Sequence, residues 1–313
     1  MLNFIVRRAL STIPVFAVVG VIVFLMLRLM PGDPAAAIVG EGGTTADIAR
    51  IRAQLGLDDS LLTQMALWFN RLLHLDFGES YFQKQAIGTL IAQRIEPTLS
   101  LAAVTIVIAV VVSVPLGVLA AWRHGGWLDR ALMSLSVVGF SVPVFVVGYV
   151  AIWFFGLQLQ WVPTQGYSRL ADGVGPWLLR LVLPACTLSI VYIALIARVT
   201  RAAVAEALAE DHVRTARAKG LSEGRVLVRH ALSNAAVPIV TVIGLGVASL
   251  IGGVVVTETV FAIPGLGALT VDAVLARDYP LVQGLTLSFS VVYVLINLLV
   301  DLSYLLFDPR IRY

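Results

Sequence analysis

Six stretches of the chain contain no Asp, Glu, Lys or Arg and are long enough, or nearly so, to cross a lipid bilayer as helices. A spanning helix needs about 20 mostly apolar residues, because it must cross a hydrocarbon core of about 30 Å at about 1.5 Å per residue. The stretches are rich in Val, Leu, Ile and Ala without a period of two, which favours helices over barrel strands. They cover residues 9–27, 97–122, 131–168, 181–197, 230–257 and 279–300.

Composition agrees with a chain that lies in the membrane. Hydrophobic residues make up 59% of the 313, and charged residues 13%, against about 25% in a soluble domain. We therefore predict an all-α membrane protein whose residues 1–313 form a single transmembrane domain. Its predicted spans are about 5–30, 97–122, 131–157, 180–205, 235–258 and 280–306.

The single cysteine, Cys186, has no partner in the chain, so the sequence excludes an internal disulfide and a CxxC metal or redox site. We expect Cys186 to be a small buried hydrophobic residue.

The distribution of Lys and Arg predicts the orientation. With both termini in the cytoplasm, the inner segments 1–8, 123–130, 198–230 and 308–313 hold 13 of the 22 basic residues in 55 positions. The outer segments hold the other nine in 115 positions. The positive-inside rule then gives an N-in, C-in topology, and the basic residues need no nucleic-acid partner to explain them.

The outer segment 31–96 is too long to be a mere connection. The sequence Thr44-x-x-Asp47 resembles a capping box before a helix that Gly56 is placed to end. Ser60 then precedes a second amphipathic helix that contains Leu61 and Trp68. We predict a small extracytoplasmic helical lobe, which either contacts a partner or packs on the outer rim of the membrane domain.

The inner segment 198–230 contains the most specific pattern. Good helix formers from Ala202 to Lys219 predict that the fourth span extends into the cytoplasm. Gly220 breaks this helix, and Ser222 with Glu223 can start a second, short one. Such a helix–Gly–helix suits the docking of another protein; the alternative is a charged loop that only obeys the topology rule.

The sequence of this loop resembles the coupling loop of ABC importer permeases. The family pattern is Glu-Ala-Ala, three residues, Gly, nine residues, then Ile-x-Leu-Pro; aligned on Gly220, its two ends fall on Arg214-Thr215-Ala216 and on His230-Ala-Leu-Ser233. The spacing fits. The departures resemble the dipeptide/oligopeptide branch, where Arg-Thr-Ala-x-Ala-Lys-Gly-Leu and His-x-Leu-x-Asn are usual.

The resemblance covers nearly the whole chain, because further family motifs follow in order. They are Arg7-Arg8, Leu29-Met-Pro-Gly-Asp-Pro34, Leu55-Gly-Leu-Asp58, Asp76-Phe-Gly-Glu-Ser-Tyr81, Glu258-Thr-Val-Phe261, Pro264-Gly-Leu-Gly267, Arg277-Asp-Tyr-Pro280, Asn297-Leu-Leu-Val-Asp301 and Asp308-Pro-Arg-Ile-Arg312. The last resembles the C-terminus of the first of the two permeases that such systems encode.

The resemblance implies a type I ABC importer permease, a multi-pass subunit of the bacterial inner membrane that forms half of a pathway for di/oligopeptides. Nickel chelates, glutathione or another small solute are alternative cargoes. The implied partners are a second, homologous permease, two ATP-binding-cassette ATPases and an extracytoplasmic substrate-binding protein. No catalytic residue, cofactor or metal is implied. The implied ATPase-coupling residues, within the coupling loop 202–230, are Arg214, Thr215, Ala216, Lys219, Gly220 and Leu221.

Two alternative classes of protein are an intramembrane hydrolase and an ion-coupled carrier. Gly139-Phe-Ser141 resembles a membrane serine nucleophile, but the four histidines lie in loops or at span ends, and neither H-E-x-x-H nor G-x-S-x-G occurs. Ser141, beside Pro143, is better explained as bonding a carbonyl at a helix bend. An ion-coupled carrier would place ionisable groups deep in the membrane, whereas Arg28, Glu258 and Asp301 lie towards span ends. The chain also lacks a phosphate-binding loop, so a partner must supply the energy.

Isolated polar residues within the spans could line a transport path. We expect them instead to bond backbone carbonyls or neighbouring helices. They are Ser134, Ser136, Ser141, Tyr149, Tyr192, Ser288 and Tyr293.

Overall fold

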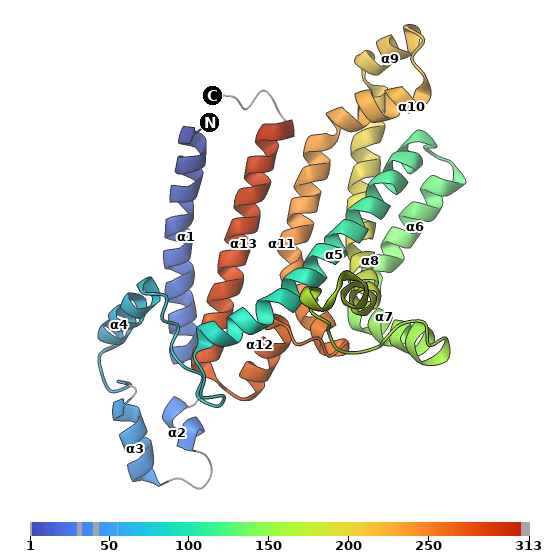
Figure 1. Ribbon diagram of the computed structural model, residues 1–313. Helices are drawn as coiled ribbons and strands as arrows, with labels where there is room; N and C mark the ends of the chain where they lie inside the picture. The colour runs from blue at the N-terminus through green and yellow to red at the C-terminus, as the bar shows by residue number, and fades with distance from the viewer. Residues whose placement is uncertain (1, 30–32, 40–43, 55, 308–313) are drawn as a thin grey trace. The chain divides into compact units, whose positions relative to one another are not determined.

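The computed structural model describes residues 2–29, 33–39, 44–54 and 56–307, and these ranges are helical almost throughout (Figure 1). They contain no named strand, only an isolated bridge between Glu79 and Ala86. The predicted all-α class is confirmed. The helices are α1 Leu2–Leu29, α2 Pro34–Val39, α3 Thr45–Gln54, α4 Leu61–Leu73, α5 Ile87–Trp122, α6 Trp127–Ser141, α7 Val144–Ala151, η1 Ile152–Gln158, η2 Leu170–Asp172, α8 Val174–Ala209, α9 Asp211–Ala218, α10 Glu223–Arg225, η3 Val226–Leu232, α11 Ala236–Val260, α12 Leu266–Leu275 and α13 Tyr279–Phe307.

Within the described ranges, four helices are long and apolar enough to cross a membrane: α5, α8, α11 and the Tyr279–Val300 part of α13. A fifth candidate is the pair formed by α6 and the following helix to Gln158, if the bent pair counts as one span. The apolar part of α1, Leu10–Leu25, is shorter. The count of six spans and their orientation therefore stay predictions.

The chain divides into two compact units. Unit 1 comprises Pro97–Pro264 and the chain from Leu295 onward, and unit 2 comprises Leu2–Glu96 and Gly265–Val294. The expectation of a single domain over 1–313 stays a prediction.

The core of unit 1 lies between α5, α8 and α11. Its fully buried side chains include Leu101 of α5, Leu188 of α8 and Leu250 of α11. Helices α5 and α8 approach closely at Gly117, where a Cβ atom would lie 2.7 Å from Cβ of Thr200 and 2.8 Å from the carbonyl oxygen of Ala197. No side chain larger than hydrogen fits there without a shift of the helices.

The break between α6 and α7 is the sharpest bend in a candidate span. The axes of α6 and of the following helical segment differ by 98°. Pro143 cannot donate a backbone hydrogen bond, and Ser141 Oγ donates to the carbonyl of Val137 at 2.8 Å. This confirms the predicted role of Ser141 at a bend.

Other polar side chains in the spans also bond their own helix, as predicted. Ser136 Oγ donates to the Leu132 carbonyl and Ser288 Oγ to the Gly284 carbonyl. Cys186, by contrast, is exposed, so the prediction that it is buried is wrong. Its neighbours Ala185 and Thr187 face the core of unit 1 and leave Cys186 on the outer face of α8.

In unit 2, the segment before α5 forms the predicted helical lobe. Thr44 and Asp47 cap α3 reciprocally, with Thr44 Oγ1 donating to Asp47 Oδ2 at 2.7 Å and the Asp47 amide donating back to Thr44 Oγ1 at 3.2 Å. Helix α3 ends just before Gly56, whose φ is +62°. Ser60 caps α4 by accepting from the Thr63 amide. Both predicted helices are confirmed.

A second set of buried side chains holds unit 2 together. Ile87 and Leu90 of α5 pack against Leu266 and Leu269 of α12 and Leu285 of α13. Gly284 lets the helices approach, since a Cβ there would lie 2.6 Å from Cγ2 of Ile87. Thus the two chain segments of unit 2, one before Pro97 and one after Pro264, share one core.

Candidate functional site: the loop between α8 and α11

Helix α8 ends earlier than predicted. The sequence predicted one helix through Lys219, but α8 stops at Ala209 and Glu210 is extended, with φ −74° and ψ 153°. The reason is burial. The turn at Glu210 brings Val213 and Ala216 of α9 onto Val226, and all three are buried. A straight extension would leave these apolar side chains in water, at a cost of about 25 cal/mol per Å².

Gly220 ends α9 in a Schellman motif. The Gly220 amide donates to the Arg217 carbonyl at 2.9 Å, and the Leu221 amide donates to the Ala216 carbonyl at 3.3 Å. This pattern needs a left-handed residue after the helix, and Gly220 has φ +78°. Leu221 then packs against the buried cluster of α9. The predicted reversal at glycine is confirmed.

Two polar contacts brace α9. Asn234 Nδ2 donates to His212 Nε2 at 2.7 Å, and Nδ1 of the same ring lies 3.0 Å from Glu210 Oε2. Arg217 donates to both carboxylate oxygens of Glu223, at 2.9 and 3.1 Å. These hydrogen bonds hold the pKa of Glu223 below its ordinary value. Each family motif of the loop is therefore tied to a residue outside it: Asn234 to His212, and Arg217 to Glu223.

The six predicted coupling residues separate into two groups. Arg214, Thr215, Lys219 and Gly220 are exposed together at the tip of the loop. Ala216 is buried and Leu221 is half-buried, so these two support the tip from inside. A partner protein would meet two cationic side chains, a hydroxyl and a bare backbone turn.

Sequence reasoning missed a buried ion pair near the cytoplasmic end of unit 1, as the predicted topology orients it. Arg201 of α8 donates to Asp129 of α6 with Nε at 2.9 Å and Nη2 at 2.7 Å. The Gly125 amide donates to the same carboxylate at 3.0 Å, and the Asp129 side chain is only 5% exposed. Asp129 is the one acidic residue in the predicted inner segment 123–130, which is the signal that could have identified it.

The candidate ionisable groups for a carrier are placed as follows. Glu258 is fully buried two residues before the end of α11 and accepts from Thr98 Oγ1 at 2.6 Å. The side chains of Arg28 and Asp301 lie outside the described residues. In the described part of the chain, no group of three or more His, Cys, Asp or Glu is placed to hold a metal ion.

Family models match both parts of the chain. Residues 113–313 match the model described as "Binding-protein-dependent transport system inner membrane component", and residues 1–102 match the N-terminal model of the same systems. The chain belongs to this family. It is therefore a multi-pass permease of the inner membrane, as its apolar helices require.

Full-length relatives agree with this assignment. The permease is 54% identical over 310 residues to a probable peptide ABC transporter permease protein of Sinorhizobium fredii, with 99% of each chain covered. It is 42% identical over 313 residues to the glutathione transport system permease protein GsiC of Salmonella choleraesuis, with 100% of each covered. The predicted membership of the ABC permease family is confirmed.

Solved structures support the fold. An inward-facing structure of the MetNI methionine ABC transporter matches 70% of the permease and 96% of its own chain, with a TM-score of 0.59 and 18% identity. An amino acid ABC transporter matches 69% of the permease and 92% of its own chain, with a TM-score of 0.51 and 15% identity. At these identities the likeness shows the type I importer permease fold alone.

Proposed function

We propose that this permease forms half of the translocation pathway of an ATP-driven importer for di/oligopeptides. A second, homologous permease supplies the other half, two ATP-binding-cassette ATPases supply the energy, and an extracytoplasmic binding protein delivers the peptide. The observation that carries the proposal is the tip of the α8–α11 loop. It is exposed and cationic, yet it stands on a buried apolar base.

The mechanism follows from how that tip is attached. Helix α9 is joined to α8 through one extended residue, Glu210, and to the segment just before α11 through the hydrogen bond between His212 and Asn234. An ATPase that moves the tip on ATP binding moves both helices, and the pathway changes the side to which it opens. The chain supplies no bond chemistry in this cycle.

A second cargo, glutathione, is favoured by one observation: the full-length relative GsiC, at 42% identity, belongs to a glutathione transport system. Glutathione is a tripeptide, so the two readings share a chemical class. Competition between a labelled dipeptide and unlabelled glutathione for uptake by the reconstituted importer separates them.

Substitutions at Gly220 test the coupling role. A Cβ at this position meets no atom of the chain within 4 Å, so the intramolecular cost of Gly220→Val comes from its positive φ, about 1–2 kcal/mol. We expect the Gly220→Val protein to insert into the membrane and to pair with the second permease. The importer that contains it should lose peptide uptake, and little ATPase subunit should co-purify with it.

Gly220→Asn is the matched control, because asparagine tolerates the left-handed conformation better than other residues with a side chain. It should keep more ATPase attachment and uptake than the valine variant. Normal uptake and normal substrate-stimulated ATP hydrolysis with Gly220→Val would show that this loop does not couple the subunits.

A further inference from the structure

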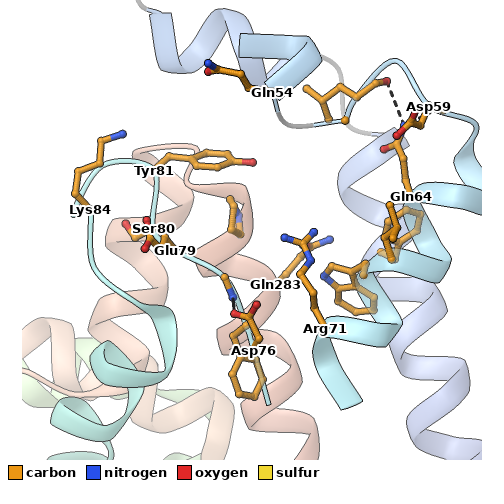
Figure 2. Close-up of a pocket in the computed structure, with 18 residues that line it drawn as sticks. Gln54, Asp59, Gln64, Arg71, Asp76, Glu79, Ser80, Tyr81, Lys84 and Gln283 are labelled. Atoms are coloured by element: carbon orange, nitrogen blue, oxygen red, sulfur yellow. Dashed lines mark hydrogen bonds between the residues drawn. The ribbon is translucent and has the colours of Figure 1, made fainter. Parts of the chain in front are cut away.

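A cavity of about 380 Å³ lies in unit 2, within the range of small-molecule sites. Its walls come from the end of α3, one face of α4, the segment after α4 and the start of α13. Figure 2 shows the guanidinium of Arg71 and the hydroxyl of Tyr81 pointing into the same space from opposite walls.

The lining is charged with both signs. Arg71 and Lys84 are cationic, and Asp59, Asp76 and Glu79 are anionic. Within the described ranges, neither Arg71 nor Lys84 has a carboxylate within 4.0 Å, although three carboxylates line the same cavity. Charges kept apart in this way are available to a ligand with both a positive and a negative group.

Gln64 ties the cavity wall to the segment before α4. Its Nε2 donates to the carbonyls of Leu57 and Asp59, at 3.1 and 2.8 Å, which fixes the orientation of the amide. Its Oε1 is buried and has no hydrogen-bond partner among the described residues.

The segment that forms one wall is held in place rather than loose. Ser80 Oγ donates to buried Asp278, and the Tyr81 amide donates to the same carboxylate at 3.2 Å. Lys84 has φ +52°. This left-handed conformation is unfavourable in free energy for any residue that has a Cβ atom. Strained residues held by their surroundings are typical of ligand-binding positions.

We infer that this cavity binds a short peptide through its free ends. Arg71 is placed to bind the α-carboxylate, to which its planar guanidinium can donate two hydrogen bonds. Glu79 and Asp76 line the same cavity and can accept hydrogen bonds from the α-ammonium, and Trp68 and Phe77 offer apolar surface to side chains. The identification of the ligand as a peptide rests on the proposed function. The requirement that the ligand carry both a positive and a negative group rests on the charged residues that line the cavity.

Binding of alanylalanine to the complete permease–ATPase complex, in nanodiscs and without the binding protein, tests the inference. We expect saturable binding that weakens at least about tenfold with the C-terminal amide, with the N-acetyl form and with Arg71→Gln, since each removes a hydrogen bond to a charged group. Arg71→Lys should lose less. Arg50→Gln, an exposed cation of the same lobe outside the cavity, should bind as the parent does.

A second measurement guards against a folding defect in Arg71→Gln. With Cys186 replaced by serine, the variant Gln283→Cys places a thiol in the cavity wall and Arg50→Cys places one elsewhere on the lobe. Alanylalanine should slow maleimide labelling at position 283 and leave position 50 unchanged. Equal effects at both positions, no binding, or equal binding by Arg71→Gln and Arg50→Gln would overturn the inference.

Uptake into proteoliposomes, with the binding protein added, keeps this inference separate from the proposed function. Peptide uptake without binding in the cavity contradicts the inference alone. Binding in the cavity without ATP-dependent peptide uptake contradicts the proposed function and leaves the peptide site supported.

Discussion

Ser80 and Asp278, 198 residues apart in the sequence, share a hydrogen bond in which the Ser80 hydroxyl donates to a buried carboxylate. The amides of Tyr81 and Phe82 donate to the same carboxylate at 3.2 and 3.4 Å. Two sequence motifs, Asp76–Tyr81 and Arg277–Pro280, thus form one structural element. Both also line the cavity of unit 2.

Removal of this carboxylate should loosen the segment after α4. In Asp278→Ala, one hydroxyl and three amides, including that of Leu281 in α13, lose their acceptor, at a cost of about 1–3 kcal/mol. We expect faster hydrogen exchange of the amides of residues 80–84 in the membrane-embedded protein. The control Asp272→Ala changes an exposed carboxylate of α12 and should leave exchange unaltered; equal exchange in both variants would contradict this role.

The ion pair between Arg201 and Asp129 should stabilise unit 1. Removing one partner of a buried pair costs about 3–5 kcal/mol, and because the Arg201 side chain is 21% exposed, the lower end applies. Arg201→Gln and Asp129→Asn should each lower the unfolding temperature in detergent. The double variant should lose much less than the sum, since the second change no longer leaves a charge unpaired. Additive losses would show that the two residues act independently.

The orientation of the chain is testable with single cysteines. With Cys186 replaced by serine, Thr215→Cys should react with a membrane-impermeant maleimide only in inverted vesicles. Arg50→Cys should react only from outside, because the positive-inside rule places the helical lobe there. Both positions are exposed, so failure to react reports the membrane side rather than burial. The reverse pattern would invalidate the coupling assignment.

The contact between Arg217 and Glu223 should make the loop sensitive to acid. Its hydrogen bonds lower the folded pKa of Glu223, so their contribution is present above the unfolded pKa of about 4.3 and is lost as pH falls through the lower, folded value. A spin label at Lys219→Cys, in a background without Cys186, should become more mobile over that fall.

Glu223→Gln separates this contact from other carboxylates of the loop. The variant should be mobile already at neutral pH and should respond less to acid. Because both side chains are exposed, salt should weaken the contact as well. An unchanged acid response in Glu223→Gln would assign the effect to another group, such as Asp211.

Local patterns in the sequence were sufficient for much of the fold. The capping pair Thr44 and Asp47, the helix end at Gly56 and the reversal at Gly220 all follow from short-range hydrogen bonding and backbone preference, which a single sequence records. The bend at Ser141 was likewise predictable from Pro143.

Features that depend on distant contacts were not predictable. The early end of α8 at Ala209 results from the burial of Val213 against Val226, which no helix propensity reports. The exposure of Cys186 depends on which face of α8 meets the core. The partnership of Asp129 with Arg201 joins residues 72 apart, and the cavity of unit 2 joins α4 to the start of α13.

The extended residue Glu210 has a mechanical consequence. A continuous helix to Lys219 would be a long lever fixed only at α8, and its tip would swing without moving other helices. The short α9 is instead held at its first turn, to α8 by the chain and to the segment before α11 by the hydrogen bond between His212 and Asn234, and near its last turn by Arg217 and Glu223. A force applied at Gly220 therefore displaces α8 and α11 together, instead of bending one of these helices.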